Sequence, residues 1–156
     1  MIYVIDHNDS FTHNVVHQLS LFGKVECDNY NQINQNKLKN AEVIVFSPGP
    51  GNPKDYPETS KIYKKFKGKK KMIGICLGFQ QILFCEGAEI VEQKKIYHGF
   101  QSNIKVVNDK SLFQKGRIFK VGRYHSLKLK EPFNNDNFTI TMRCLNSKVA
   151  MTFENT

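Results

Sequence analysis

Short apolar runs alternate with amphipathic stretches over the first half of the chain. The apolar runs have the length of strands and occupy residues 2–5, 25–30, 41–46 and 72–75. Stretches that predict helices lie between and after them, at residues 10–23, 57–67 and 78–87. The Asn/Gln/Lys-rich residues 31–40 predict a loop and a weak helix. Strands and helices that alternate in this order predict a parallel sheet with right-handed crossover connections.

The first predicted helix has the clearest pattern. Its apolar face consists of Phe11, Val15, Leu19 and Phe22. Ser10 is the expected N-cap, and Gly23 is the expected residue just past the C-terminal end. We therefore expect this face to be buried against the sheet.

The pattern changes in the second half of the chain. Apolar and polar residues alternate over residues 88–107 and 117–127, which predicts strands. Residues 138–142 and 149–153 alternate in the same way around a turn, which predicts a hairpin. We expect an α/β fold with a mostly parallel central sheet flanked by helices, and an antiparallel extension in the second half. Its 156 residues suit a single domain, 1–156.

Composition narrows the class of protein. The chain is 40% hydrophobic and 24% charged, which excludes a disordered or low-complexity protein. No run approaches the ~20 apolar residues of a membrane span, so we expect no membrane contact. The first residues contain no basic leader, which indicates a cytoplasmic protein. The four cysteines lack C-x-x-C spacing, and we expect neither disulfides nor a metal nor any other cofactor.

A net charge of +9 makes nucleic acid a candidate partner. Much of the excess lies in lysines between positions 61 and 71, with Ile62, Tyr63 and Phe66 among them at helical spacing. A solvated basic helix face is the simpler interpretation, and we expect no nucleic-acid partner. A docking surface for an acidic partner, or a basic binding module without enzymatic activity, is the alternative.

Gly74-Ile75-Cys76-Leu77-Gly78 is the strongest candidate for chemistry. A cysteine between a buried strand and a helix, flanked by glycines, has the arrangement of a nucleophile elbow. The helix N-terminus favours the thiolate form of Cys76 and directs the Leu77 N–H toward a developing oxyanion. An inert buried cysteine is the competing interpretation.

Ser47-Pro48-Gly49-Pro50-Gly51 follows another predicted parallel strand, so it should lie at the same edge of the sheet. It lacks the spacing of a phosphate-binding loop. An amide near Gly49 or Gly51 is a candidate second oxyanion donor, and a rigid turn without a ligand is the alternative. His125 is a candidate partner of Cys76 or a residue that only holds a loop. His13 and His17 lie four residues apart on the first predicted helix without the glutamate of an H-E-x-x-H motif, so they are interpreted as surface residues, with a zinc-binding pair as the alternative.

These segments, together with Ile5-Asp6-His7-Asn8-Asp9-Ser10-Phe11-Thr12, His98-Gly99 and Arg123-Tyr124-His125-Ser126-Leu127, resemble the class I (triad-type) glutamine amidotransferases. The order of the segments matches that family over nearly the whole chain. The similarity is greatest to the small glutaminase subunits of anthranilate synthase and aminodeoxychorismate (para-aminobenzoate) synthase. The resemblance implies a flavodoxin-like core, L-glutamine as substrate and a larger chorismate-binding synthase subunit as partner.

By this resemblance Cys76 is the nucleophile that attacks the side-chain amide of glutamine. The backbone at Gly49, Pro50, Gly51 and Leu77 would bind substrate and stabilise the oxyanion. Gln80 and the backbone of Ser126 and Leu127 would hold the α-amino and carboxylate groups. The segment from Asp9 to Thr12 and the pair His98-Gly99 would belong to the side that docks on the synthase, and His125 does not match the catalytic histidine of the family.

Two features depart from the family pattern. Phe79 stands where the family commonly has histidine, and we expect only a change in packing. The family's catalytic histidine and glutamate lie in a His-Pro-Glu motif after the last hairpin, and residues 1–156 contain no such motif. We therefore expect this 156-residue form to be nearly inactive as a glutaminase. A cysteine hydrolase of another small substrate, with His125 as base, is the alternative enzyme.

Overall fold

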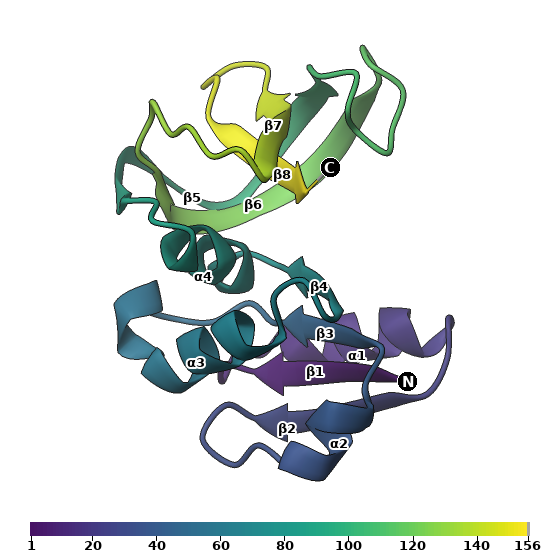
Figure 1. Cartoon of the computed structure of the whole chain (residues 1–156). Coiled ribbons are helices and arrows are strands. Elements are labelled where there is room, and N and C mark those ends of the chain that lie inside the picture. Colours follow the sequence, from purple (N-terminus) through teal and green to yellow (C-terminus); the bar gives the residue numbers. More distant parts are fainter. Residues whose placement is uncertain (156) are drawn as a thin grey trace. The chain divides into compact units, whose positions relative to one another are not determined.

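The computed structural model describes residues 1–155 and divides into two compact units, Met1–Gly87 and a second unit that begins at Ala88. The first unit alternates strands and helices, as the apolar runs predict (Figure 1). Its elements are β1 (Ile2–Asp6), α1 (Thr12–Ser20), β2 (Val25–Asn29), α2 (Gln35–Asn40), β3 (Val43–Phe46), the 3-10 helix η1 (Pro53–Asp55), α3 (Pro57–Phe66), β4 (Lys71–Gly74) and α4 (Leu77–Cys85).

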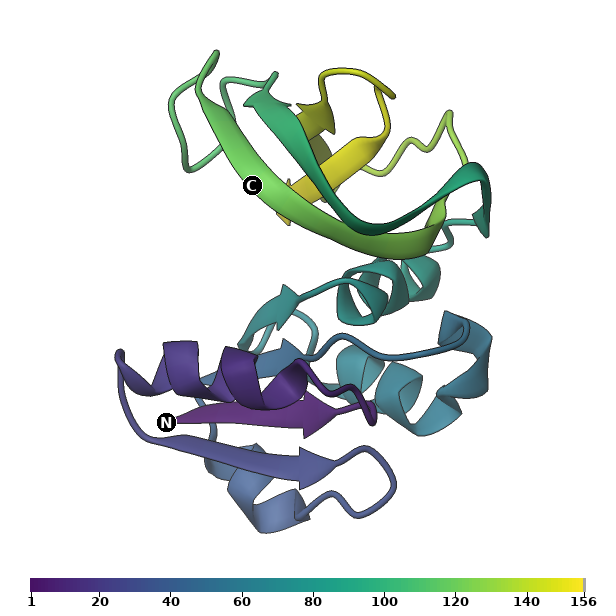
Figure 2. The ribbon, with the colours of Figure 1, turned by 180° about the vertical axis from the view of Figure 1, so that it is seen from behind.

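The four strands of the first unit form a parallel sheet in the order β2-β1-β3-β4. Helix α1 covers one face of this sheet, where Val15 packs against Val4 and Val45 (Figure 2). Helices α2 and α3 cover the other face, where Phe46 lies in a larger cluster with Leu38. Because both faces are covered, the central strands are apolar at nearly every position. The predicted parallel α/β arrangement is confirmed.

Helix α1 differs from its prediction at both ends. Phe11 occupies the N-cap position without a side-chain cap, and its N–H donates to the Asp9 carboxylate, 2.8 Å away, so the assignment of Ser10 as N-cap was wrong. Phe11 and Phe22 lie outside the helix and are 58% and 83% exposed. The buried face is narrower than the periodicity indicated because the helix ends at Ser20.

Helix α3 is amphipathic, as the sequence indicates. Ile62, Tyr63 and Phe66 are buried on its inner side, and Lys64 and Lys65 are exposed. The lysine-rich segment is therefore largely a solvated helix face. Within residues 1–155, no helix is both long and apolar enough to cross a membrane.

The second unit is antiparallel, as the alternating pattern predicts. Its strands are β5 (Ile90–Val106), β6 (Ile118–Leu129), β7 (Phe138–Cys144) and β8 (Ala150–Asn155). They form a four-stranded sheet of their own in the order β6-β5-β7-β8, and β7 and β8 form the predicted hairpin. Ile104, Val106 and Met142 are the centre of its apolar core.

Candidate active site of the first unit

Cys76 lies at the turn between β4 and α4, in a backbone conformation that residues with a side chain rarely adopt. Its φ and ψ angles are 53° and −107°, and it precedes the first residue of α4. Strained residues of this kind persist where the surrounding structure holds them, and they are common at active sites. The strand–turn–helix geometry predicted for a nucleophile elbow is therefore present at Cys76.

The glycines beside Cys76 make this turn sterically feasible. A Cβ added at Gly74 would lie 2.5 Å from the backbone carbonyl group of Gly78. A Cβ added at Gly78 would collide with the backbone carbonyl group of Phe46 at the end of β3. Only glycine at both positions lets the chain reverse this close to the neighbouring strand.

The acidity of Cys76 differs from the sequence expectation. Burial raises the pKa of the Cys76 thiol, the Leu77 N–H that bonds the sulfur lowers it, and the charge of Asp9 raises it further. Burial is the largest of these effects, so the net direction is upward and the thiol is favoured over the thiolate. The expected thiolate was wrong because the motif reveals the helix N-terminus but not the desolvation. A thiol of this kind requires a base to take its proton before it can attack a substrate.

The proline-glycine loop begins directly beside this turn. The Gly78 N–H donates to the Ser47 carbonyl oxygen, 3.1 Å away, and the Ile75 N–H donates to that of Phe46. A Cβ added at Gly49 would lie 2.5 Å from Cδ2 of Leu77. The loop and the cysteine turn are thus in contact, as expected for two parallel strands that end at the same edge of the sheet.

His7 packs against the proline-glycine loop at Gly49. It is fully buried, and a Cβ on Gly49 would also lie 2.5 Å from the His7 Cβ. The Ser47 hydroxyl donates to the Pro48 carbonyl oxygen and accepts the His7 N–H. The His7 ring lies between Ser47 Oγ, 3.3 Å from Nδ1, and Thr59 Oγ1, 3.2 Å from Nε2. Burial lowers the pKa of His7 to about 4, so the ring is neutral near pH 7.

The far side of the loop is also fixed. The Tyr56 hydroxyl donates to the Pro50 carbonyl oxygen at 2.8 Å. Asn52 caps η1 in a capping box with Asp55, whose carboxylate accepts the Asn52 N–H. Gly51 has a φ of 78°, which glycine adopts without strain. The backbone from Gly49 to Gly51 is therefore held from both ends, as a preorganised binding loop requires.

Gln80 lies one turn into α4. It is 6% exposed, and its N–H donates to the Cys76 carbonyl oxygen at 3.1 Å. Leu77 is almost fully buried. The first unit therefore brings Cys76, the Gly49–Gly51 loop, Leu77 and Gln80 to the same edge of its sheet.

Ser126 and Leu127, the other two predicted binding residues, lie on β6 in the second unit. His125 precedes them, and both of its ring nitrogens have partners within that unit. Arg123 Nε donates to His125 Nε2 at 3.1 Å, and His125 Nδ1 lies 2.9 Å from the Leu127 carbonyl oxygen. Since a guanidinium only donates, Nδ1 carries the ring proton, and its 2.8 Å approach to Gln93 Nε2, which is also a donor, is a close contact and not a hydrogen bond. Burial and the Arg123 charge lower the pKa of His125, although the Leu127 bond raises it. These contacts favour a loop-holding role for His125 over that of a base.

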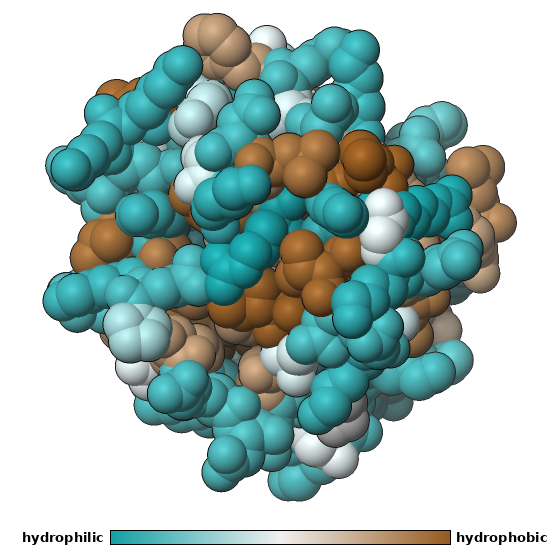
Figure 3. Space-filling view, turned by 90° about the horizontal axis from the view of Figure 1, so that it is seen from above, coloured by the Kyte–Doolittle hydropathy of each residue, from teal (hydrophilic) through white to brown (hydrophobic). Residues whose placement is uncertain are grey.

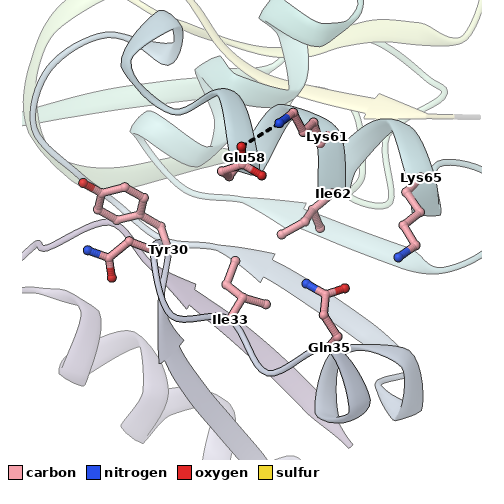
Figure 4. A pocket seen from close by; sticks show the side chains of 8 residues that line it. Tyr30, Ile33, Gln35, Glu58, Lys61, Ile62 and Lys65 are labelled. Atoms are coloured by element: carbon pink, nitrogen blue, oxygen red, sulfur yellow. Dashed lines mark hydrogen bonds and ion pairs between the residues drawn. The ribbon is translucent and has the colours of Figure 1, made fainter.

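A separate cavity of about 350 Å³ lies between α3 and the segment that joins β2 to α2 (Figure 4). Tyr30, Ile33 and Ile62 contribute apolar surface, and Lys61 is paired with Glu58 at 2.6 Å. None of the predicted site residues lines it.

The described histidine, cysteine and acidic side chains do not gather into a metal site. Among residues 1–155, no three histidine, cysteine or acidic side chains are grouped as a metal site would require. His13 and His17 are exposed, as predicted. The four cysteines are free thiols.

With this geometry in place, comparison with known proteins defines the class. The family described as Glutamine amidotransferase class-I matches residues 3–156, and the chain belongs to this family. Anthranilate synthase component 2 of Lactococcus lactis is 32% identical over 99% of this chain and 79% of its own length. The aminodeoxychorismate/anthranilate synthase component 2 of Bacillus subtilis is 32% identical over 90% of this chain and 74% of its own length.

A solved structure supports the fold independently. A glutamine amidotransferase from Thermotoga maritima superposes with a TM-score of 0.76, covering 99% of this chain and 70% of that one at 15% sequence identity. An identity this low bears on the fold alone.

Sequence reasoning missed the supports behind the site. His7 is part of a segment that carries the family resemblance, but nothing in its spacing indicates that it packs against Gly49. Thr59 lies in α3, and Tyr56 directly precedes that helix. The sequence indicates this region only as a basic helix and the residues before it. Their role depends on which segments the parallel sheet places side by side.

Proposed function

We propose that this chain is the glutaminase subunit that hydrolyses L-glutamine to glutamate and supplies ammonia to a larger, chorismate-binding synthase subunit. The observation that carries the proposal is Cys76, held in a strained turn beside the Gly49 loop. The names of the relatives, which are second components of synthases, support a partner subunit.

The proposed chemistry assigns a role to each part of the site. The Cys76 sulfur attacks the side-chain amide carbon of glutamine, and the carbonyl oxygen becomes an oxyanion. Backbone N–H groups of Leu77 and of the Gly49–Gly51 loop stabilise that charge. The C–N bond breaks, the nitrogen takes a proton and leaves as ammonia, and water hydrolyses the thioester to glutamate. Gln80 and the Ser126–Leu127 backbone hold the α-amino and carboxylate groups.

A general base must accept the Cys76 proton, because burial raises the pKa of this thiol. In the family this base belongs to a His-Pro-Glu motif, which residues 1–156 do not contain. Such a base contributes roughly 10²–10⁴-fold to the rate.

The product that receives the ammonia is either anthranilate or aminodeoxychorismate, for tryptophan or folate synthesis. One relative carries both names, which is consistent with a subunit type shared by the two reactions. We propose that the subunit acts in the cytoplasm, where its four free cysteines would stay reduced.

The test uses a form extended by a C-terminal segment that carries a His-Pro-Glu motif. Its release of ammonia and glutamate from L-glutamine is measured with and without Cys76→Ala. We expect the variant to lose at least ~10³-fold in rate. Cys85→Ala, which removes a half-buried thiol from the same helix, is the matched control and keeps the rate. Unchanged ammonia release in Cys76→Ala would refute the proposal.

A further inference from the structure

The ladder between β5 and β6 is interrupted opposite Ser126. Glu92 pairs with Leu127, and the next pair along the ladder is Tyr97 with His125. The four residues from 93 to 96 on β5 thus stand opposite the single residue Ser126. An irregularity of this kind redirects the backbone, and it occurs often beside functional sites.

At this point the side chain of Gln93 makes hydrogen bonds to β6 where backbone pairing between β5 and β6 is interrupted. Its Nε2 donates to the carbonyl oxygens of His125, at 3.1 Å, and of Leu127, at 3.2 Å. The two carbonyl groups flank Ser126. One side-chain amide therefore fixes the backbone on both sides of the interruption.

Gln93 is held in turn by a buried cation. Arg123 is 1% exposed, and its Nη2 donates to Gln93 Oε1 at 3.2 Å. Its guanidinium lies 3.6 Å from the centre of the Tyr97 ring, and Nη1 donates to Ser147 Oγ at 3.3 Å. Burying a guanidinium is costly unless its donors are bonded, so these contacts also fix where Gln93 can lie.

His125 completes the arrangement. Arg123 donates to its Nε2, and its protonated Nδ1 donates to the Leu127 carbonyl oxygen. The Leu127 carbonyl oxygen therefore accepts hydrogen bonds from both the imidazole and the Gln93 amide. Side chains from two strands thus converge on the carbonyl oxygens of His125 and Leu127, on either side of Ser126.

We propose that Gln93, Arg123 and His125 are positioning residues that hold the Ser126–Leu127 backbone in the shape that receives the α-amino and α-carboxylate groups of an amino-acid substrate. This inference rests on the proposed function. The three side chains act through the backbone and take no part in proton transfer or in making and breaking covalent bonds.

The experiment uses the form extended by a His-Pro-Glu segment and measures alkylation of its Cys76 by the chloromethyl ketone analogue of L-glutamine, followed by peptide mass spectrometry. The dependence of the alkylation rate on reagent concentration separates the affinity for the reagent from the maximal rate of alkylation. Gln93→Leu removes both hydrogen bonds that Gln93 donates to this backbone and the one that it accepts from Arg123. We therefore expect the affinity for the reagent to fall about tenfold, with a maximal rate within about twofold of the parent. Iodoacetamide has no α-amino or carboxylate group, and its rate at Cys76 should not change.

A second pair of variants separates positioning from folding. His125→Ala should weaken the affinity about tenfold, whereas the side-chain amide in His125→Asn can donate in place of Nδ1 and should restore most of it. Unchanged affinity in both Gln93→Leu and His125→Ala would overturn the inference, as would a parallel loss of the iodoacetamide rate. If the extended form with Gln93 and His125 intact shows no saturable alkylation, the proposed function fails and this inference fails with it.

Discussion

The two units of the chain hold their predicted site residues in different ways. The first unit places a parallel sheet between helices, and Val4, Ile5, Ile44, Val45 and Phe46 are fully buried in it. The core of the second unit is smaller, and its central residues pack against Phe119, Val121 and Met151, which are only partly buried. Apolar side chains of the chain are visible between polar ones in Figure 3.

This difference matches what each unit holds in place. A strained cysteine needs neighbours that cannot move away, and the close approach of Gly78 to Phe46 provides them. The second unit instead fixes its backbone by a buried polar network centred on Arg123. Tight packing therefore positions the proposed nucleophile, and directional hydrogen bonds position the proposed contacts to the substrate's α groups.

The largest effect is expected from truncating the two cores. Ile44→Ala removes a fully buried side chain of the first unit and should lower its free energy of unfolding by about 4 kcal/mol. Met142→Ala in the second unit should cost about 2 kcal/mol, because its partly exposed neighbours can relax into the space. Hydrogen exchange at the amides of β3 and β5 reports each unit separately. Equal costs would contradict the difference in packing between the two units.

A methyl group at the cysteine turn should have the next largest effect. Gly78→Ala places a Cβ against the Phe46 backbone and should destabilise the first unit by about 3 kcal/mol. Gly122→Ala is the matched control in the second unit, because its Cβ would lie 3.6 Å from Tyr124, an ordinary contact. Urea unfolding followed by hydrogen exchange measures both. A tolerated Gly78→Ala would show that the turn is not tightly packed.

The stability of the first unit should depend on pH through His7. Its pKa is about 4 in the folded chain against an ordinary 6.5, so the unfolded chain binds a proton in this window that the folded chain does not. Stability is therefore lost as the pH falls from 6.5 to 4, by up to about 3 kcal/mol. His7→Gln should remove this part of the pH dependence at the β3 amides. His13→Gln, at an exposed position, should leave it in place, and a slope that survives His7→Gln would contradict the assignment.

The smallest effect is expected at the surface of α3. Lys61 and Glu58 form an exposed ion pair, and Lys61→Ala should change the free energy of unfolding by less than about 0.5 kcal/mol. RNA binding by the parent chain, with a steep dependence on salt that Lys61→Ala and Lys65→Ala reduce, would instead favour the basic binding module.

The sequence predicted the elements better than the contacts. Apolar runs bounded by glycine and proline located the four parallel strands, and alternation located the β7–β8 hairpin. Periodicity does not show where a helix ends, so Phe11 and Phe22 were placed on a buried face although both are exposed. A charged residue such as Arg123 is expected at the surface, and its burial depends on partners 30 and 24 residues away in the sequence, Gln93 and Ser147.

The candidate site was predicted in the same uneven way. The spacing of Gly74, Cys76 and Gly78 indicated the strained turn, because its steric reason is local. The raised pKa of the Cys76 thiol was not predictable, since burial depends on how the chain packs around it. The two supports of the Gly49 loop, His7 and Tyr56, were missed for the same reason.

The central claim is that Cys76 is the residue that attacks the side-chain amide of bound glutamine. The most direct test is alkylation of the parent chain by iodoacetamide, with the four cysteines followed separately by mass spectrometry, in the presence and absence of L-glutamine. We predict that L-glutamine slows alkylation at Cys76, that D-glutamine does not, and that neither changes the rates at Cys27, Cys85 and Cys144. A rate at Cys76 that L-glutamine leaves unchanged would contradict the account.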